Sequence, residues 1–390
     1  MQKVVWAGTH HSSFAAATKS LKVLAEISLS ESQVRRITTL IGEDRVAERR
    51  EQVTAFTNKT LMERTTAKSG VAPPEVGVLM LDNGTHQRRD HFGDPGQKTH
   101  WKQETGGLVL SMTSKVHEHD PCPEFPEWLF DNDVVSEIAS LAHRREDPGN
   151  HGDSTFEDET PLAPQGQAGF EWTPKVVSRD VIASTEGVDV ARHLEWIAWE
   201  HGVTSTPRQA LVSDGASSIW GIHKKYFSHM TPIIDLMHAL SYAYRAAAVL
   251  DEEGLYRRWA RAIWQGRVGQ VLAELTTHRE RLGLPPQDAS ADDPRQRIHR
   301  AATYYTNHES RMNYPEYRRL GLPITSSLME STIKQLSRRV KGTEKFWNKS
   351  TADAILQLAA DSQSDSQPLK DFWNRWQHKI TGMNRYRTNA

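Results

Sequence analysis

Hydrophobic residues near the start of this 390-residue chain recur three or four positions apart. This spacing predicts an amphipathic helix, because it places the apolar side chains on one face. The positions are Phe14, Ala17, Leu21, Leu24 and Ile27. A polar break at residues 28–30 ends this helix, and Ser30 with Gln33 matches the capping box that opens another. Residues 1–70 are therefore expected to be helical.

The middle of the chain contains short apolar runs that are rich in β-branched residues and bounded by polar ones, which is typical of strands. These runs cover residues 76–81, 105–113, 176–182, 209–212 and 231–235. Residues 143–168 are instead polar, acidic and rich in Pro and Gly, which predicts a flexible surface insert. Strands that alternate with helical segments favour a mixed sheet covered by helices.

Helical spacing returns between residues 240 and 310, where Trp259 and Trp264 are predicted core residues. The chain thus divides into four predicted regions. They are a helical region at 1–70, the first part of an α/β domain at 71–239, an all-helical insertion at 240–312, and the completion of the α/β domain with a basic tail at 313–390.

Composition narrows the class of protein. Hydrophobic residues make up 37% of the chain and charged residues 25%, which is ordinary for a globular protein. The single cysteine, Cys122, excludes an internal disulfide and a thiolate zinc cluster. No apolar run approaches the roughly 20 residues of a membrane helix, and the first residues do not resemble a secretory signal. We expect a cytoplasmic protein.

The net charge of −1 hides an asymmetry along the chain. Residues 311–390 contain 14 lysines and arginines against 7 acidic residues, so this segment carries +7 and the remainder −8. A basic segment of this kind is typical of a phosphate-binding surface.

Three acidic residues stand in contexts that suit metal chemistry. Asp82 and Asp214 each follow an apolar run, and Glu330 lies near the start of a helical pattern. Carboxylates gathered from two strand ends and one helix can hold two Mg²⁺ ions about 3.5–4 Å apart, which clamp the attacking and leaving oxygens of a phosphoryl displacement.

Each acidic residue also has a simpler interpretation. Asp82-Asn-Gly and Asp214-Gly are typical turn sequences. Glu330 follows Ser327 by three residues, so it could be the partner in a capping box. Against this, Lys334 and Arg338 follow Glu330 at intervals of four, on one helix face suited to phosphates.

Four blocks, in this order, resemble a DDE transposase of bacterial insertion sequences with an RNase H-like catalytic domain. They are LMLDNGT at 79–85, HWKQE at 100–104, LVSDGASSIWG at 211–221 with its continuation IDLMHA at 234–239, and GLPITSSLMESTIKQL at 321–336. The resemblance implies that Asp82, Asp214 and Glu330 form the catalytic triad and bind the metal. It also implies a mixed five-stranded sheet with flanking helices and an all-helical insertion before the glutamate.

The same resemblance implies the reaction and its participants. Two Mg²⁺ ions, which Mn²⁺ can replace, would support cleavage of the element's DNA ends and strand transfer into target DNA. The DNA partners would be the terminal inverted repeats and the target, and the protein would act as a homo-oligomer, expected to be a dimer, at the nucleoid. Asp235 and His238 match a D-x-x-H motif of several such families, and His238 is a candidate DNA contact.

Other candidate DNA contacts come from basic residues. On and after the Glu330 helix they are Lys334, Arg338, Arg339 and Lys341. Arg35 and Arg36 would lie exposed on the second N-terminal helix, in a helix-turn-helix-like arrangement that reads DNA or in a hairpin that only supports the next domain. Two rival functions stay open: a catalytically inactive DNA-binding protein of transposase descent, and an RNase H-like nuclease that cuts without joining.

Overall fold

The computed structural model describes residues 1–89, 100–146, 172–250, 252–342 and 345–381. The predicted surface insert at 143–168 therefore lies almost entirely outside the described residues. The chain forms two compact units. One unit comprises Met1–Ser111, Val176–Thr206 and Met329–Ala390, and the other comprises Met112–Lys175 and Pro207–Leu328.

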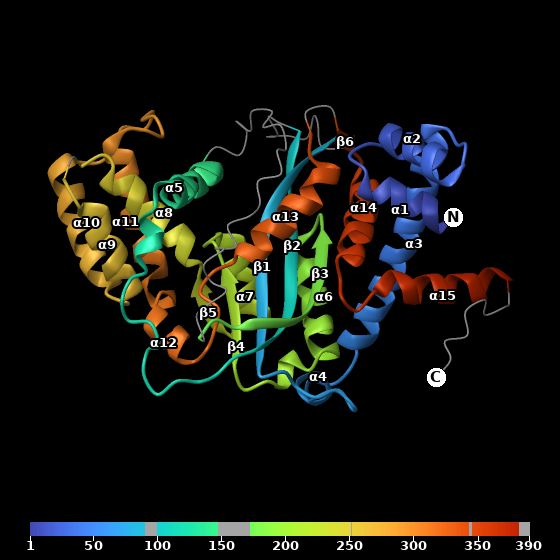
Figure 1. Cartoon of the computed structure of the whole chain (residues 1–390), viewed down its shortest axis with the longest axis horizontal. Coiled ribbons are helices and arrows are strands. Elements are labelled where there is room, and N and C mark those ends of the chain that lie inside the picture. The colour runs from blue at the N-terminus through green and yellow to red at the C-terminus, as the bar shows by residue number, and fades with distance from the viewer. Residues whose placement is uncertain (90–99, 147–171, 251, 343–344, 382–390) are drawn as a thin grey trace. The chain divides into compact units, whose positions relative to one another are not determined.

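A mixed sheet of six strands in the order β3-β2-β1-β4-β5, with β6 paired to β1, is flanked by helices (Figure 1). The strands are β1 (Val76–Arg88), β2 (Trp101–Thr113), β3 (Lys175–Ser184), β4 (Gln209–Ser213), β5 (Thr231–Ile234) and β6 (Phe346–Trp347). All five predicted apolar runs form strands, and β1 lies next to β4 as their predicted role requires. The sixth strand has only two residues, too few to carry a pattern that the sequence could reveal.

Strand β1 is longer than its apolar run predicts. Asp82 does not close the strand, because pairing with β2 continues to Arg88. Within this hairpin the Thr105 hydroxyl donates to the side-chain oxygen of Asn83 at 3.0 Å. The Asp82-Asn-Gly sequence is therefore not a turn, since pairing with a neighbouring strand overrides the local turn preference.

The described residues of the first unit contain eight α-helices. They are α1 (Gln2–His10), α2 (Phe14–Ala25), α3 (Glu31–Thr57), α4 (Leu61–Thr65), α6 (Gly187–Glu200), α13 (Ser327–Val340), α14 (Lys349–Ser362) and α15 (Pro368–Thr381). The first two residues of α13 precede the last segment of this unit. The predicted capping box of α3 is present, with Ser30 accepting from the Gln33 amide and Gln33 accepting from the Ser30 amide. Helix α1 lies within the range predicted to be helical, ahead of the apolar pattern that begins at Phe14.

Helix α3 packs against α14 through a buried polar network as well as apolar contacts. The Arg49 guanidinium, 1% exposed, donates to Gln357 Oε1 at 2.7 Å. Gln357 in turn donates to Asp361, whose carboxylate lies 2.8 Å from Arg45 Nε. Buried charges of this kind are stable only when they are paired, so the two helices hold a specific register.

The second unit is mainly helical in its described part. Its helices are α5 (Asn132–Glu146), α7 (Ser217–Tyr226), α8 (Leu236–Ala247), α9 (Leu255–Trp264), α10 (Val268–Leu282), α11 (Pro294–His308) and α12 (Tyr314–Arg319). Helices α8–α11 confirm the helical character predicted for residues 240–310. Trp259 and Trp264 are buried, as expected of core residues, and their indole N–H groups donate to Glu274 and to the Cys122 carbonyl.

Among the described residues, no helix combines the length and the hydrophobicity that crossing a membrane requires.

Candidate functional site

Asp214 stands where the buried strand β4 ends. Its Oδ1 accepts from the Ala216 amide at 2.9 Å and from the Ser213 hydroxyl at 3.2 Å. The first bond closes a tight turn that leads into α7, with Gly215 in the left-handed region at φ 103°. The side chain is half-buried and is held by its own loop. The structure thus confirms the turn interpretation of Asp214, and its role as a metal ligand stays a prediction.

Asp235 leaves the neighbouring strand at the same edge of the sheet. Strands β4 and β5 are parallel with Ser213 opposite Ile234, and the Asp235 amide donates to the Ser213 carbonyl at 3.0 Å. The carboxyl ends of parallel strands meet at one edge, where α/β proteins commonly bind ligands. Asp214 and Asp235 therefore emerge from adjacent strand ends.

Three tyrosines between residues 304 and 314 form hydrogen bonds to these two strand ends and to α8. Tyr304 donates to the Asp214 carbonyl at 3.1 Å, and Tyr314 donates to the Ile234 carbonyl at 3.1 Å. Tyr305 donates to the Ala239 carbonyl in α8 at 2.6 Å. Burial raises the pKa of Tyr305 and of Tyr314 well above the ordinary value, so both hydroxyls stay protonated and keep donating.

The Asp235 carboxylate is fully buried and is the N-cap of α8. Its oxygens accept from the Met237 and His238 amides, each at 3.4 Å, and from the Ser326 amide at 3.1 Å. The His238 ring Nδ1 lies 2.5 Å from Oδ2. Asp235 thus joins the start of α8 to the residue that precedes α13, and it also fixes the orientation of the imidazole.

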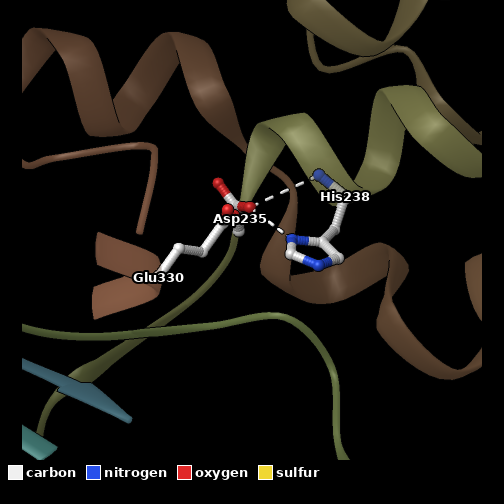
Figure 2. A group of neighbouring side chains, drawn as sticks. All are labelled: Asp235, His238 and Glu330. Atoms are coloured by element: carbon white, nitrogen blue, oxygen red, sulfur yellow. Dashed lines mark hydrogen bonds and ion pairs between the residues drawn. The ribbon is translucent and has the colours of Figure 1, made fainter. Parts of the chain in front are cut away.

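Glu330 lies in the first turn of α13 and completes a group that could hold a metal ion. One ligand atom from each of Asp235, His238 and Glu330 lies within 4.8 Å of the others. Figure 2 shows the two carboxylates directed toward each other, with the imidazole beside Asp235. Two carboxylates and an imidazole suit several divalent ions, whereas Mg²⁺ prefers an all-oxygen set.

The hydrogen bonds of Asp235 limit its part in metal binding. A carboxylate offers about four acceptor positions, and four donors already approach Asp235. This side chain is better suited to positioning His238 and the start of α13 than to binding an ion directly. Glu330 is the member of the group that the sequence predicts as a metal ligand.

Asp82 lies on the face of β1 that α13 covers. The Asn83–Thr105 contact and the bond from the Arg88 amide to the His100 carbonyl set a register that pairs Asp82 with Gly106. A Cβ placed on Gly106 would lie 2.6 Å from Ile333 and 2.9 Å from Met329, so the first two turns of α13 rest on this spot. Met329 directly precedes Glu330.

The structure thus brings Glu330 together with Asp235 and His238, two residues whose sequence context does not predict metal binding. The signal was present in the D-x-x-H sequence, because an aspartate at a helix N-cap accepts from the residue three positions later. That the carboxylates of Asp82, Asp214 and Glu330 converge to bind the same two metal ions stays a prediction.

The predicted DNA contacts differ in exposure. Arg35, Arg36 and Arg338 are exposed, and Lys334 and Lys341 are half-buried. His238 is only 7% exposed, and its Nδ1 is engaged by Asp235, so any DNA contact would have to come through the other ring nitrogen.

Arg339 does not fit the role predicted for it. It is 4% exposed, its Nε donates to the Gly8 carbonyl at 2.9 Å, and its guanidinium lies over the rings of Phe14 and Trp347. Burial lowers the pKa of Arg339 to about 10. The side chain joins α13 to α1 and α2, and it is not presented to a phosphate.

No protein-family model matches the chain, and no curated protein sequence matches it either.

Proposed function

We propose that the chain is a DDE transposase with an RNase H-like fold, which cleaves the DNA ends of its element and joins the freed 3′-OH to target DNA. The observation that carries the proposal is the setting of Glu330. It lies within 4.8 Å of Asp235, and the Asp235 backbone is bonded to the strand end that carries Asp214. The turns of α13 around Glu330 rest on the residue opposite Asp82. These contacts support a common site for the three predicted carboxylates.

In this mechanism Asp82, Asp214 and Glu330 would hold two Mg²⁺ ions, which would supply charge neutralisation for the attacking and leaving oxygens. The protein does little covalent chemistry, because phosphoryl transfer depends mainly on positioning and electrostatics. Asp235 positions the start of α13 and the His238 ring. The tyrosines that bond to the carbonyls of Asp214 and Ile234 hold the two strand ends rigid.

The DNA backbone would be bound by cations that are at least partly exposed. Lys334, Arg338 and Lys341 lie on or just after α13, the helix that carries Glu330, and Arg35 and Arg36 lie on α3. The DNA partners are the terminal inverted repeats and the target, and a dimer of the protein would hold the two ends. This nucleic-acid function would place the protein at the nucleoid.

We expect the salt dependence of DNA binding to report these contacts. Replacement of Lys334, Arg338 and Lys341 by Ala should flatten the plot of log affinity against log salt by about 0.9 per lost phosphate contact. Band shifts over a salt series would measure the slope. Arg339→Lys is the matched control, because its side chain is buried and its replacement should leave the slope unchanged. A wild-type slope for the triple variant would exclude α13 from the DNA interface.

One assay separates the proposed function from its two rivals. Purified protein is incubated with Mg²⁺, a duplex bearing the inverted repeats that flank the gene, and a target plasmid. A transposase cuts the ends and joins them to the plasmid. Cutting without joining would indicate an RNase H-like nuclease, and binding without cutting would indicate an inactive DNA-binding protein. Either of these results would contradict the proposal.

A further inference from the structure

Helix α13 lies directly on the backbone of the β1–β2 hairpin at two glycines. A Cβ on Gly106 would be 2.6 Å from Ile333, and a Cβ on Gly84 would be 2.7 Å from Glu104 Oε1 and 3.0 Å from Ser337 Oγ. A Cβ at either position would displace the side chains that pack against it, so glycine lets the helix approach this closely without such shifts. Because α13 packs this closely on the β1–β2 hairpin, changes in the hairpin would alter the position of the helix.

A buried carboxylate, Glu104, links α13 to this hairpin. Glu104 is 2% exposed, its Oε1 accepts from the Ser337 hydroxyl at 3.2 Å, and its Oε2 lies 2.9 Å from Nδ1 of His86. His86 is fully buried and Ser337 is 7% exposed. Glu104 closes the second of the four blocks that resemble a transposase, and the catalytic triad gives it no role. A buried polar group of this kind is costly unless its hydrogen-bonding partners stay in place.

The position of Glu330 depends on this link. Ser337 follows Glu330 by seven residues, which is two helical turns or about 10.5 Å, so both side chains project from nearly the same side of α13. Ile333 lies between them and contacts Gly106, the residue opposite Asp82. Fixing Ser337 above Gly84 therefore fixes the rotation and the sliding position of α13, and with them the direction of Glu330.

We infer that Glu104 is a positioning residue: through Ser337 and His86 it sets α13 on the β1–β2 hairpin and thereby aims Glu330 toward the metal site. This inference rests on the proposed role of Glu330. It assigns no contact with substrate or metal to Glu104 itself.

Three variants of the full chain test the inference: Glu104→Ala, Glu104→Gln and Ser337→Ala. Binding of Mn²⁺ alone is followed by electron paramagnetic resonance, and the Mg²⁺ concentration for half-maximal DNA cleavage is measured in parallel. Glu104→Ala should weaken both by about 10–100-fold, the usual effect of removing a group that orients a metal ligand. Ser337→Ala should weaken them less. Glu104→Gln should stay within about threefold of wild type, because its amide can still bond to Ser337.

The chain offers a matched control in Asp180 of β3. This carboxylate is also buried, accepts from the Ser366 hydroxyl at 2.5 Å and pairs with His201, and none of these residues lies on α13. Asp180→Ala should lower the melting temperature without moving the metal dependence. The inference is overturned if Glu104→Ala binds Mn²⁺ as tightly as wild type, or if Asp180→Ala weakens binding equally.

Failure of the proposed function gives a different pattern. If the wild-type protein neither binds Mn²⁺ nor cuts DNA, the proposed function fails. Hydrogen exchange of the α13 amides then decides whether Glu104 fixes the helix. Faster exchange in Glu104→Ala, but not in Glu104→Gln or Asp180→Ala, supports the positioning role, and equal exchange in all of them contradicts it.

Discussion

Replacing Asp214 with Asn should lower the rate of DNA cleavage by about 10²–10³-fold, the range for removing a group that stabilises transition-state charge. The amide is a poor ligand for Mg²⁺ compared with a carboxylate. The fold should persist, because the amide oxygen can still accept from the Ala216 amide, as Oδ1 of Asp214 does now. Affinity for the DNA ends should stay nearly unchanged. Single-turnover cleavage and band shifts on the same duplex measure the two effects.

Asp288→Asn is the control for the charge change, because Asp288 is exposed in a turn of the same unit. It should cleave DNA at the wild-type rate. Cleavage by Asp214→Asn within about tenfold of wild type, a difference of only 1.4 kcal/mol in the barrier, would exclude Asp214 from the metal site.

The largest effect on stability is expected at Asp120. The guanidinium of Arg318 is fully buried and forms paired bonds with Asp120, from Nε to Oδ1 at 2.9 Å and from a terminal nitrogen to Oδ2 at 2.5 Å. The guanidinium also lies 4.1 Å from the ring centroid of Trp264. Asp120→Ala leaves this charge buried without its counter-ion, and should lower the free energy of unfolding by about 3–5 kcal/mol. Urea denaturation would measure the loss.

A double variant separates the cost of burying an unpaired Arg318 charge from the cost of losing the Asp120–Arg318 contact. Asp120→Ala combined with Arg318→Leu should be more stable than Asp120→Ala alone, because removing both charges abolishes the desolvation cost. Asp292→Ala is the surface control. Its partner is Arg297 and its side chain is 75% exposed, so the loss should stay below about 1 kcal/mol. Equal losses in all three variants would show that burial of Arg318 is not the cause.

Periodicity along the sequence predicts the types of the main elements correctly. The apolar runs become strands, and the spacing between residues 240 and 310 becomes helices, because burial of one face is a local property of the sequence. The end of β1 could not be predicted in this way. Asp82-Asn-Gly carries a strong turn preference, but pairing with β2, which includes the contact of Asn83 with Thr105, 22 residues away, keeps it extended.

Residues of the candidate site can be predicted from the sequence where the signal lies in neighbouring residues. They cannot be predicted where their role arises from packing between distant segments. Glu330 stands out because basic residues follow it on one helix face, and Asp235 carries an N-cap signature. Glu104 gives no local signal, because its role arises from a hydroxyl more than 200 residues later in the chain. The charge of Arg339 suggests a DNA contact, but Arg339 follows the buried Leu336 by three residues and so shares its buried face.

The most direct test of the central claim is a crystal structure of the protein with Mn²⁺, with the ions located by anomalous scattering. We expect manganese bound by the carboxylates of Asp82, Asp214 and Glu330, with a second ion about 3.5–4 Å from the first when DNA is present. Manganese bound by Asp235 and His238 without Asp82 and Asp214, or no manganese near Glu330, would contradict the account.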